Sequence, residues 1–312
     1  MKIEIKDESH WHELRAKSIG GSEVAALYGR SSYQTPWQLW QTKAGNLNAP
    51  FDDTYTRAGH YFESAIAAWA ADKWGMKIDK VREYYTDDTT QGMGASLDYA
   101  TETGEPVEIK FNHYAGSDWV FENGELVDVP EQYIWQVQHQ LACYGGDHGW
   151  LVAFAKGEPH RIRIRRSERI IDSIRQHVSD FWQSIADKEP PPVDLKEDGK
   201  ALATMMFMRG VRDVDLSEHE ALFEEYKVHS DTEKAAGILA KEAKTKIMSL
   251  YESAIKVVNE PVDKAVITAG KYQMVVNRVA DSEGKLVTPA MVGTYVGSRK
   301  GHLRTQLKEV VK

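Results

Sequence analysis

Strict alternation of apolar and polar positions predicts a strand over residues 107–111. Its two faces differ in chemistry: one carries Val107, Ile109 and Phe111, and the other carries Glu108 and Lys110. Thr103-Gly104-Glu105-Pro106 predicts a turn, and the strand before it, over residues 94–100, contains Asp98. A hairpin symmetric about Thr103 places Asp98 directly opposite Glu108. Two carboxylates and a lysine then share one side of the hairpin.

Segments with apolar residues at helical spacing alternate along the chain with segments that predict further strands. Helices are predicted over 8–17, 56–74, 131–144 and 167–188, and strands over 81–85, 150–155 and 160–165. In the helix over 56–74, the expected buried stripe is Phe62, Ala65, Ile66 and Trp69, with Glu63 at its edge. This order of elements predicts a mixed α/β (α+β) domain with a central mixed sheet flanked by helices.

Pro190-Pro191-Pro192 marks the predicted end of this first domain, residues 1–192. Residues 193–312 form the predicted C-terminal helical/β extension, of unknown role. A heptad seam runs along a helix over 217–258, and we expect it to pack on its own domain rather than on a partner helix: Ala236, Ala240, Ala243, Ile247, Leu250, Ala254 and Val257. A hairpin through Ala269-Gly270, a short final helix and a basic tail complete the prediction.

Composition limits the class of protein. The chain has 312 residues and a net charge of −8, which argues against a surface coated in basic groups for nonspecific nucleic-acid binding. A local DNA-binding groove remains compatible with this charge if divalent metal offsets a carboxylate cluster. The single cysteine, Cys143, excludes an internal disulfide and any all-cysteine metal site. No signal peptide or apolar run long enough for a membrane is evident, so a cytoplasmic location is expected.

The paired carboxylates have two interpretations. A surface strand with a cross-strand ion pair is one of them. The other is a metal site for phosphodiester hydrolysis, because Mg²⁺ prefers hard oxygen ligands such as Glu63, Asp98, Glu108 and the backbone carbonyl of Ile109. Lys110 would then lower the pKa of the attacking water or stabilise developing charge.

A second candidate site lies near the N-terminus. Gly20-Gly21-Ser22 precedes a predicted helix in which Ser22 is the expected N-cap, and Arg15 lies close by in sequence. A helix start with a hydroxyl and a nearby arginine is a natural phosphate site. The alternative is an ordinary turn followed by a cap.

Asp98, then nine intervening residues, then Glu108-Ile109-Lys110 resembles the PD-(D/E)XK nuclease signature. Five further motifs occur around it in order: Trp11-His12-Glu13-Leu14-Arg15, Ile19-Gly20-Gly21-Ser22-Glu23, Gly59-x-x-x-Glu63, Gly94-Ala95-Ser96-Leu97-Asp98 and Gln136-Val137-Gln138. Together they resemble the YqaJ-like viral recombinase family, the relatives of phage lambda exonuclease, over roughly residues 10–190. Leu97 departs from the proline usual in that motif, and only His113 stands where the family has an arginine after the catalytic lysine.

The resemblance implies a restriction-endonuclease-like core and a Mg²⁺-dependent 5′-to-3′ exonuclease for double-stranded DNA, with Mn²⁺ as a substitute metal. Glu63, Asp98, Glu108 and the Ile109 carbonyl would bind metal, Lys110 would be catalytic, and Gln136 would position the lysine or the water. The implied 5′-phosphate contacts are Arg15, Ser22 and Ser96. Implied partners are DNA ends, a phage single-strand annealing protein that receives the 3′ tails, and two further copies in a ring-shaped homotrimer, in a host cytoplasm if phage-encoded.

Other functions stay open from the sequence. A RecB/Cas4-like nuclease acting on single-stranded DNA would use the same chemistry, although a single cysteine excludes its iron–sulfur branch. A non-catalytic DNA-end-binding or recombination scaffold protein would keep the fold without the chemistry. An annealing or scaffold role in residues 200–312 is a third alternative.

Overall fold

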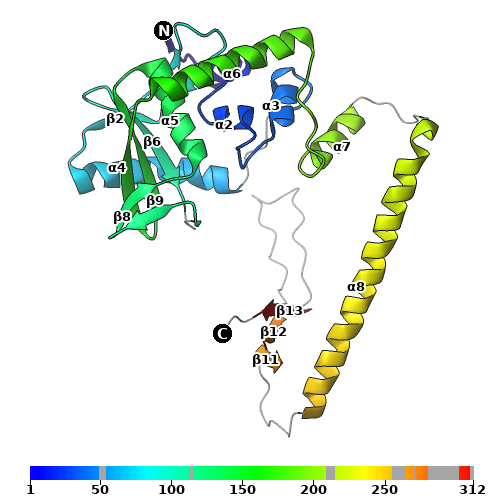
Figure 1. The fold of residues 1–312 in the computed structure, drawn as a ribbon. Helices are drawn as coiled ribbons and strands as arrows, with labels where there is room; N and C mark the ends of the chain where they lie inside the picture. The colour runs from blue at the N-terminus through cyan, green and yellow to red at the C-terminus, as the bar shows by residue number, and fades with distance from the viewer. Residues whose placement is uncertain are drawn as a thin grey trace, which may run out of the picture. The chain divides into compact units, whose positions relative to one another are not determined.

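A computed structural model describes residues 1–48, 54–112, 116–208, 215–254, 264–269, 271–279 and 302–309. Contacts divide the chain into two units, Met1–Asp213 and Val214–Lys312 (Figure 1). The candidate chemistry lies in the first unit. His113, which the resemblance singled out, and Val257 of the heptad seam lie outside the described residues.

The first unit is built on a five-stranded sheet in the order β10-β9-β6-β5-β2. Its strands are β2 (Ile78–Lys80), β5 (Tyr99–Thr101), β6 (Pro106–Phe111), β9 (His148–Ala155) and β10 (Glu158–Arg165). β6 and β9 are parallel, while the other neighbours are antiparallel. The prediction of a central mixed sheet flanked by helices is therefore confirmed.

One face of the sheet is covered by α4 (Thr54–Trp74), which packs on β6 and β9. Its buried residues are Ile66, Ala67 and Ala70. The expected stripe was wrong for three positions: Ala65 is exposed, and Phe62 and Trp69 are 49% and 47% exposed. Small side chains face the sheet because they let the helix approach it closely. Phe62 instead stacks on Phe111, with ring centroids 4.9 Å apart.

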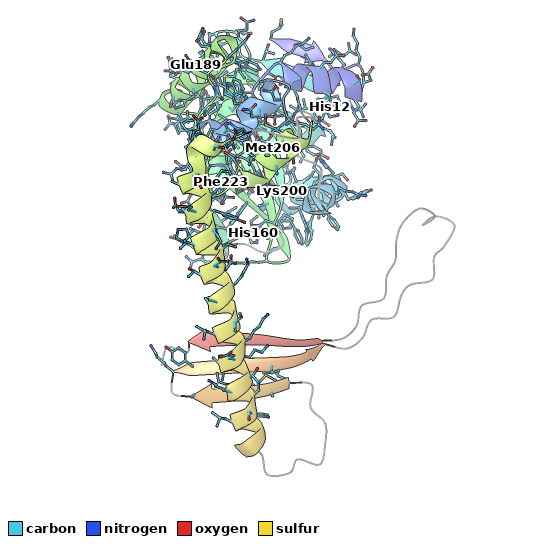
Figure 2. The ribbon with its side chains drawn as sticks, turned by 90° about the vertical axis from the view of Figure 1, so that its right-hand side faces the viewer. His12, His160, Glu189, Lys200, Met206 and Phe223 are labelled. Carbon is cyan, nitrogen blue, oxygen red and sulfur yellow. The ribbon has the colours of Figure 1, made fainter. Side chains whose placement is uncertain are left out.

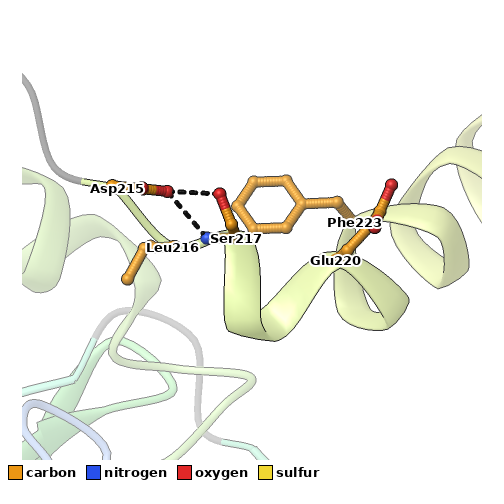
Figure 3. A pocket seen from close by; sticks show the side chains of 5 residues that line it. All are labelled: Asp215, Leu216, Ser217, Glu220 and Phe223. Carbon is orange, nitrogen blue, oxygen red and sulfur yellow. Dashed lines mark hydrogen bonds between the residues drawn. The ribbon is translucent and has the colours of Figure 1, made fainter.

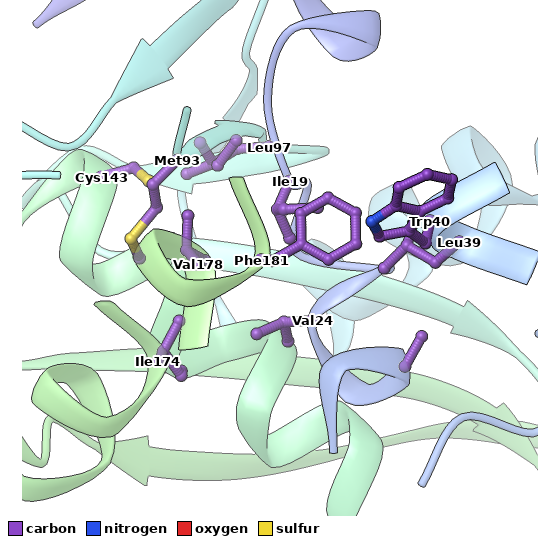
Figure 4. Close-up of a cluster of buried hydrophobic side chains, with 12 residues drawn as sticks. Ile19, Val24, Leu39, Trp40, Met93, Leu97, Cys143, Ile174, Val178 and Phe181 are labelled. Atoms are coloured by element: carbon purple, nitrogen blue, oxygen red, sulfur yellow. The ribbon is translucent and has the colours of Figure 1, made fainter. Parts of the chain in front are cut away.

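The opposite face is covered by α5 (Glu131–Tyr144), which lies where it was predicted. Val137 and Leu141 pack against Leu151 and Ala153 of β9. A further core joins α5 to α6 (Glu168–Asp187), and Figure 4 shows several of its members: Ile19, Val24, Met93, Leu97, Ile174, Val178 and Phe181. α5 is therefore buried between the sheet and α6.

A second, three-stranded sheet joins β1 (Lys2–Glu4), β3 (Glu83–Thr86) and β4 (Gly94–Ser96). The single strand predicted over residues 94–100 is therefore wrong. β4 pairs in this small sheet and β5 pairs in the central one, so the chain changes sheets at Leu97 and Asp98. Asp98 consequently lies at the end of a central strand, where its side chain is not confined to one sheet face.

The remaining elements of the first unit are short. They are α1 (Glu8–Ala16), α2 (Val24–Leu27), α3 (Pro36–Lys43), the ribbon β7 (Val120–Glu122) and β8 (Glu125–Asp128), and α7 (Gly199–Met208). The expected N-cap role of Ser22 is wrong: α2 has four residues, and Glu23 occupies the cap position. Thr35 forms a complete capping box with Gln38 at the start of α3.

The segment that follows Pro192 belongs to the first unit and is hydrogen-bonded to the start of α3. Asp198 is fully buried, and its carboxylate accepts hydrogen bonds from the Thr35 hydroxyl at 2.7 Å and the Asp194 amide at 2.7 Å. These bonds fasten the chain to the start of α3. The contact division of the chain accordingly falls after Asp213.

The second unit contains η1 (Ser217–His219), α8 (Glu220–Ala254), and a sheet of β11 (Lys264–Ala269), β12 (Tyr272–Val279) and β13 (His302–Glu309). The short final helix was a wrong prediction, because residues 302–309 pair with β12 as a strand. Along α8 apolar side chains stand exposed, among them Phe223 (Figure 2) and Leu250. Where its burial is described, the seam is exposed at Ala236, Ala240, Ala243 and Leu250 and half-buried at Ile247, which differs from the burial expected of packing on its own domain. No helix in the described ranges combines the length and apolar character needed to cross a bilayer.

Two glycines with positive φ offer a matched test of the packing around α6. A Cβ at Gly92 (φ +76°) would lie 2.2 Å from Trp182 Nε1, whereas a Cβ at Gly104 (φ +82°) would meet nothing within 4 Å. We expect Gly104→Ala to lower the free energy of unfolding by about 1–2 kcal/mol through its backbone alone. Gly92→Ala should cost about 2 kcal/mol more because it also overpacks the core. Urea unfolding of both variants checks this, and equal losses would contradict the packing.

Candidate functional site

The hairpin of β5 and β6 brings Asp98 and Glu108 together as predicted. Tyr99 pairs with Val107 and Ala100 with Pro106, the register of a hairpin symmetric about Thr103, and Asp98 directly precedes the paired residues of β5. The Ile109 amide donates a hydrogen bond of 2.8 Å to Asp98 Oδ2, which fixes the carboxylate against the neighbouring strand.

Glu108 is 4% exposed on a central strand, so the interpretation as a surface ion pair is wrong. Three donors satisfy its buried carboxylate. Lys110 Nζ and Gln136 Nε2 reach Oε1 at 2.6 and 2.7 Å, and Gln140 Nε2 reaches Oε2 at 2.5 Å. A buried charge is tolerated only when it is paired and hydrogen-bonded in this way.

Gln140 was not among the predicted site residues. It follows Gln136 by one helical turn on α5, so both amides reach the same carboxylate. The i, i+4 spacing of the two glutamines was the signal in the sequence. Gln140 is 1% exposed, and within the described part of the chain its Oε1 has no hydrogen-bond partner.

Lys110 is held as a cation. Burial alone would lower the pKa of its ammonium, but Glu108 and Asp98 outweigh burial and raise that pKa above the ordinary lysine range. The ammonium also lies 5.1 Å from the centre of the Tyr133 ring. At neutral pH Lys110 is therefore protonated, which suits stabilisation of negative charge rather than proton abstraction.

Glu63 reaches the same cluster from α4. Burial, Glu108 and Glu63, in that order, raise the pKa of Asp98 well above its usual range, which places three carboxylates within electrostatic reach. Glu63 Oε1 accepts a hydrogen bond of 2.6 Å from Lys80 Nζ on β2. Lys80 is a second member of the cluster that the sequence did not indicate.

The carboxylates do not form a finished metal site in this geometry: no three acidic, histidine or cysteine side chains among the described residues converge on one point. Their donor chemistry nevertheless fits a hard divalent cation, because Glu63, Asp98, Glu108 and the Ile109 carbonyl offer only oxygen. Burial, followed by the charges of Glu108 and Glu63, raises the pKa of Asp98, and a bound cation would offset the contribution of those charges. The residues present therefore fit Mg²⁺ or Mn²⁺.

Two of the three predicted phosphate contacts meet at Trp11. Trp11 Nε1 donates a hydrogen bond of 2.8 Å to Ser96 Oγ, and the Arg15 guanidinium lies 4.8 Å from the centre of the Trp11 ring. Ser22 is exposed on the adjoining segment. Trp11 was part of the motif used for the resemblance but had no predicted role.

A buried lysine orders the segment that carries Arg15 and Ser22. The side chain of Lys43 is 4% exposed, and its ammonium donates three hydrogen bonds of 2.8 Å, to the carbonyls of Arg15 and Ser18 and to Glu23 Oε2. The Gly20 amide donates to the same Glu23 oxygen at 2.8 Å. Burial lowers the pKa of Lys43, and Glu23 opposes that effect.

The same segment lies against α5. A Cβ at Gly21 would fall 3.2 Å from Gln136 Cγ, so the chain passes close beside the helix at this glycine. His139, fully buried one turn further along α5, bonds through Nε2 to the Gly94 carbonyl at 2.9 Å. α5 thus contacts the Gly20–Ser22 segment, β4 and the Glu108 carboxylate at once.

The structure also has two hollows away from these carboxylates. One, in the second unit, is a helix start in which the Ser217 amide donates to Asp215 at 2.9 Å beside Phe223 (Figure 3). The other, in the first unit, is a groove at the start of α5 lined by Arg30, Tyr33 and Tyr133 among others.

Comparison with known proteins agrees with the motif order. Residues 10–147 match the model of the YqaJ-like viral recombinase domain. We refer to this matched region, residues 10–147, as the YqaJ-like domain. The uncharacterized protein YqaJ of Bacillus subtilis (strain 168) is 25% identical over 178 residues, which cover 55% of this chain and 54% of that protein. The chain thus spans about half the length of this relative.

Solved structures similar to the YqaJ-like domain include the alkaline exonuclease LHK-Exo from Laribacter hongkongensis, with 18% identity, a TM-score of 0.46, and coverage of 58% of this chain and 94% of that one. A phage related exonuclease from Haemophilus somnus 129PT has 12% identity, a TM-score of 0.44, and coverage of 55% and 96%. A putative exonuclease from Eubacterium rectale has 13% identity, a TM-score of 0.45, and coverage of 68% and 94%.

The crowding of carboxylates in the YqaJ-like domain predicts a stability cost. Because folding raises the pKa of Asp98, the folded protein loses stability as pH rises from below the ordinary aspartate range through the raised value. Asp98→Asn removes that loss, and the amide oxygen can still accept from the Ile109 amide. In EDTA we expect the variant to gain more stability over wild type at pH 7 than at pH 4.

Urea unfolding at the two pH values measures this gain. Asp79→Asn, at an exposed position of β2, is the control and should change stability little at either pH. The same gain for Asp98→Asn at both pH values would refute the electrostatic origin of the cost.

Proposed function

We propose that this protein is a metal-dependent DNA exonuclease that digests one strand of a duplex from its 5′ end. The observation that carries the proposal is the convergence of Asp98, Glu108 and Lys110 on the β5–β6 hairpin, with Gln136 bonded to Glu108. These residues come from separate motifs of the YqaJ-like domain. A core without catalytic purpose would gain nothing by burying Glu108 beside a second carboxylate.

Glu63, Asp98, Glu108 and the Ile109 carbonyl are the proposed ligands of Mg²⁺, for which Mn²⁺ can substitute. Such an ion, when bound, activates water and neutralises charge on the phosphate during phosphodiester hydrolysis. Gln136 and Gln140 hold the Glu108 carboxylate in one orientation, so that ligand does not need to be ordered when metal arrives.

Lys110 acts as a fixed positive charge. Its ammonium is held by Glu108 at 2.6 Å and remains protonated because the surrounding carboxylates raise its pKa. Placed beside a scissile phosphate, it would stabilise the negative charge that develops as water attacks. A lysine oriented before the reaction stabilises that charge without reorganising its surroundings.

The end preference is assigned to Arg15, Ser22 and Ser96. A guanidinium and two hydroxyls match the oxygens of a terminal 5′-phosphate, and anchoring that group fixes the scissile bond in register. Trp11 orients Arg15 and Ser96, and Lys43 orders the segment between Arg15 and Ser22. The proposed phosphate contacts are therefore held by the half-buried Trp11 and the buried side chain of Lys43.

The proposed role is resection of DNA ends in phage-type recombination, leaving 3′ single-stranded tails for an annealing protein. A homotrimeric ring in the cytoplasm is proposed for the assembly. A ring reconciles a net charge of −8 with DNA binding, since only the inner surface has to be basic. The C-terminal unit keeps no assigned role in this proposal.

The first test is digestion of linear duplex DNA with Mg²⁺. We expect linear DNA to be degraded, closed circles to survive, and EDTA to stop the reaction. Lys110→Ala should reduce the rate by at least about 10³-fold, because a charge aimed at the transition state is lost. DNA and Mn²⁺ binding by this variant, measured separately, should persist.

Cleavage of closed circles would overturn the exonuclease assignment. Preference for single strands would favour the RecB/Cas4-like alternative. Retained activity of Lys110→Ala would remove the lysine from the mechanism.

The second test concerns the 5′ end. Arg15→Ala should abolish the preference for 5′-phosphate over 5′-hydroxyl ends, because a charge-assisted contact to the phosphate is lost. Comparing kcat/KM on both substrates measures this preference. Lys17→Ala, at an exposed position just after α1, serves as the control and should keep the wild-type ratio. An unchanged ratio in Arg15→Ala would refute the assignment.

A further inference from the structure

Lys80 forms an ion pair with Glu63, one of the carboxylates proposed to bind metal. Its Nζ lies 2.6 Å from Glu63 Oε1, and its ammonium lies 5.6 Å from the centre of the Tyr99 ring. The side chain of Glu63 is 15% exposed, whereas that of Lys80 is 56% exposed. The Glu63 side chain is thus mostly buried, whereas the Lys80 side chain that pairs with it is mostly exposed to solvent.

The charges around Asp98 form two ion pairs. Lys110 contacts Glu108 at 2.6 Å, and Lys80 contacts Glu63 at 2.6 Å. Asp98, whose Oδ2 accepts from the Ile109 amide, lies within electrostatic reach of both glutamates. Lys110 belongs to the motif of the YqaJ-like domain and has a proposed catalytic role, whereas Lys80 has none.

A divalent cation ligated by Glu63 and Asp98 would meet Lys80 at close range. Two positive centres on one carboxylate repel each other. Holding Lys80 on Glu63 and binding metal there are therefore competing states. Lys80 loses little when it leaves Glu63, because an ion pair with one exposed partner contributes little to stability.

We propose that Lys80 is an internal counter-ion, which neutralises Glu63 in the metal-free protein and is displaced when a divalent metal binds. This inference rests on the proposed function, since it assumes metal at these carboxylates. Lys80 keeps the carboxylate cluster folded without metal and weakens metal affinity by competing for Glu63. It is a positioning residue that touches no substrate.

The test is Mn²⁺ binding to the full chain without DNA, followed through the EPR signal of free Mn²⁺. Lys80→Met should bind Mn²⁺ about fivefold more tightly than wild type, which corresponds to about 1 kcal/mol for the lost competing pair. Lys77→Met is the matched control. Lys77 pairs with Glu102 at 3.1 Å, both side chains are exposed, and its removal should leave Mn²⁺ affinity unchanged.

A double-mutant cycle tests whether Lys80 changes Mn²⁺ affinity through Glu63. In a Glu63→Gln background, which has lost the shared carboxylate, Lys80→Met should change Mn²⁺ affinity by much less than fivefold. Circular dichroism checks that each variant is folded. If Lys80→Met is not folded, Mn²⁺ binding is measured with Lys80→Gln instead. Thermal unfolding gives a second readout: in EDTA, Lys80→Met should unfold at a lower temperature than wild type, and Mn²⁺ should raise its midpoint by more.

The outcomes separate this inference from the proposed function. If wild type binds Mn²⁺ and Lys80→Met binds it equally well or more weakly, Lys80 is only a structural ion-pair partner, and the inference is overturned while the nuclease proposal stands. If wild type binds no Mn²⁺, both are overturned. An equal effect of Lys80→Met with and without Glu63 would also overturn the inference.

Discussion

The burial of the Glu108 carboxylate is the interaction on which the rest of the site depends. A charge at 4% exposure on a central strand demands donors, and the fold supplies them from two elements. Lys110 comes from the same strand, and Gln136 and Gln140 come from α5. Because these bonds join strand and helix, α5 can occupy only one position on this face of the sheet.

That position of α5 connects the carboxylates to the N-terminal segment. Gly21 passes against Gln136, and His139 bonds to the Gly94 carbonyl beside the strand that carries Ser96. Lys43 completes the arrangement by tying together the backbone around Arg15. The two groups of residues proposed for metal and for phosphate are therefore parts of one continuous hydrogen-bonded and packed structure.

Electrostatic strain is concentrated where the chemistry is proposed. Burial raises the pKa of Asp98, and the two neighbouring carboxylates of Glu108 and Glu63 raise it further. Lys110 and Lys80 offset part of that charge through pairs of 2.6 Å. Such a cluster lowers the stability of the protein by itself, which is a common property of functional sites. A bound divalent cation would relieve this repulsion between carboxylates, and the relief would contribute to its binding free energy.

The sequence by itself determined the features that follow from local periodicity. The alternation in residues 107–111 assigned Glu108 and Lys110 to one face, and the turn at Thr103 set the hairpin register that brings Asp98 against β6. The bounds of α5 and the hairpin of β9 and β10 were equally readable. Side-chain period and turn position decide these features within a few residues, so no distant contact is needed to predict them.

Only the tertiary structure decided what depends on distant partners. Phe62 and Trp69 fit a buried helical stripe, yet the small residues of α4 face the sheet because close packing favours them. The chain changes sheets at Asp98 because β4 and β5 find different neighbours. Lys80 joins the site because β2, the strand that follows α4, pairs with β5 and brings the Lys80 ammonium to the Glu63 carboxylate. Pairing partners and side-chain contacts across elements are properties of the assembled core, and periodicity along the chain does not contain them.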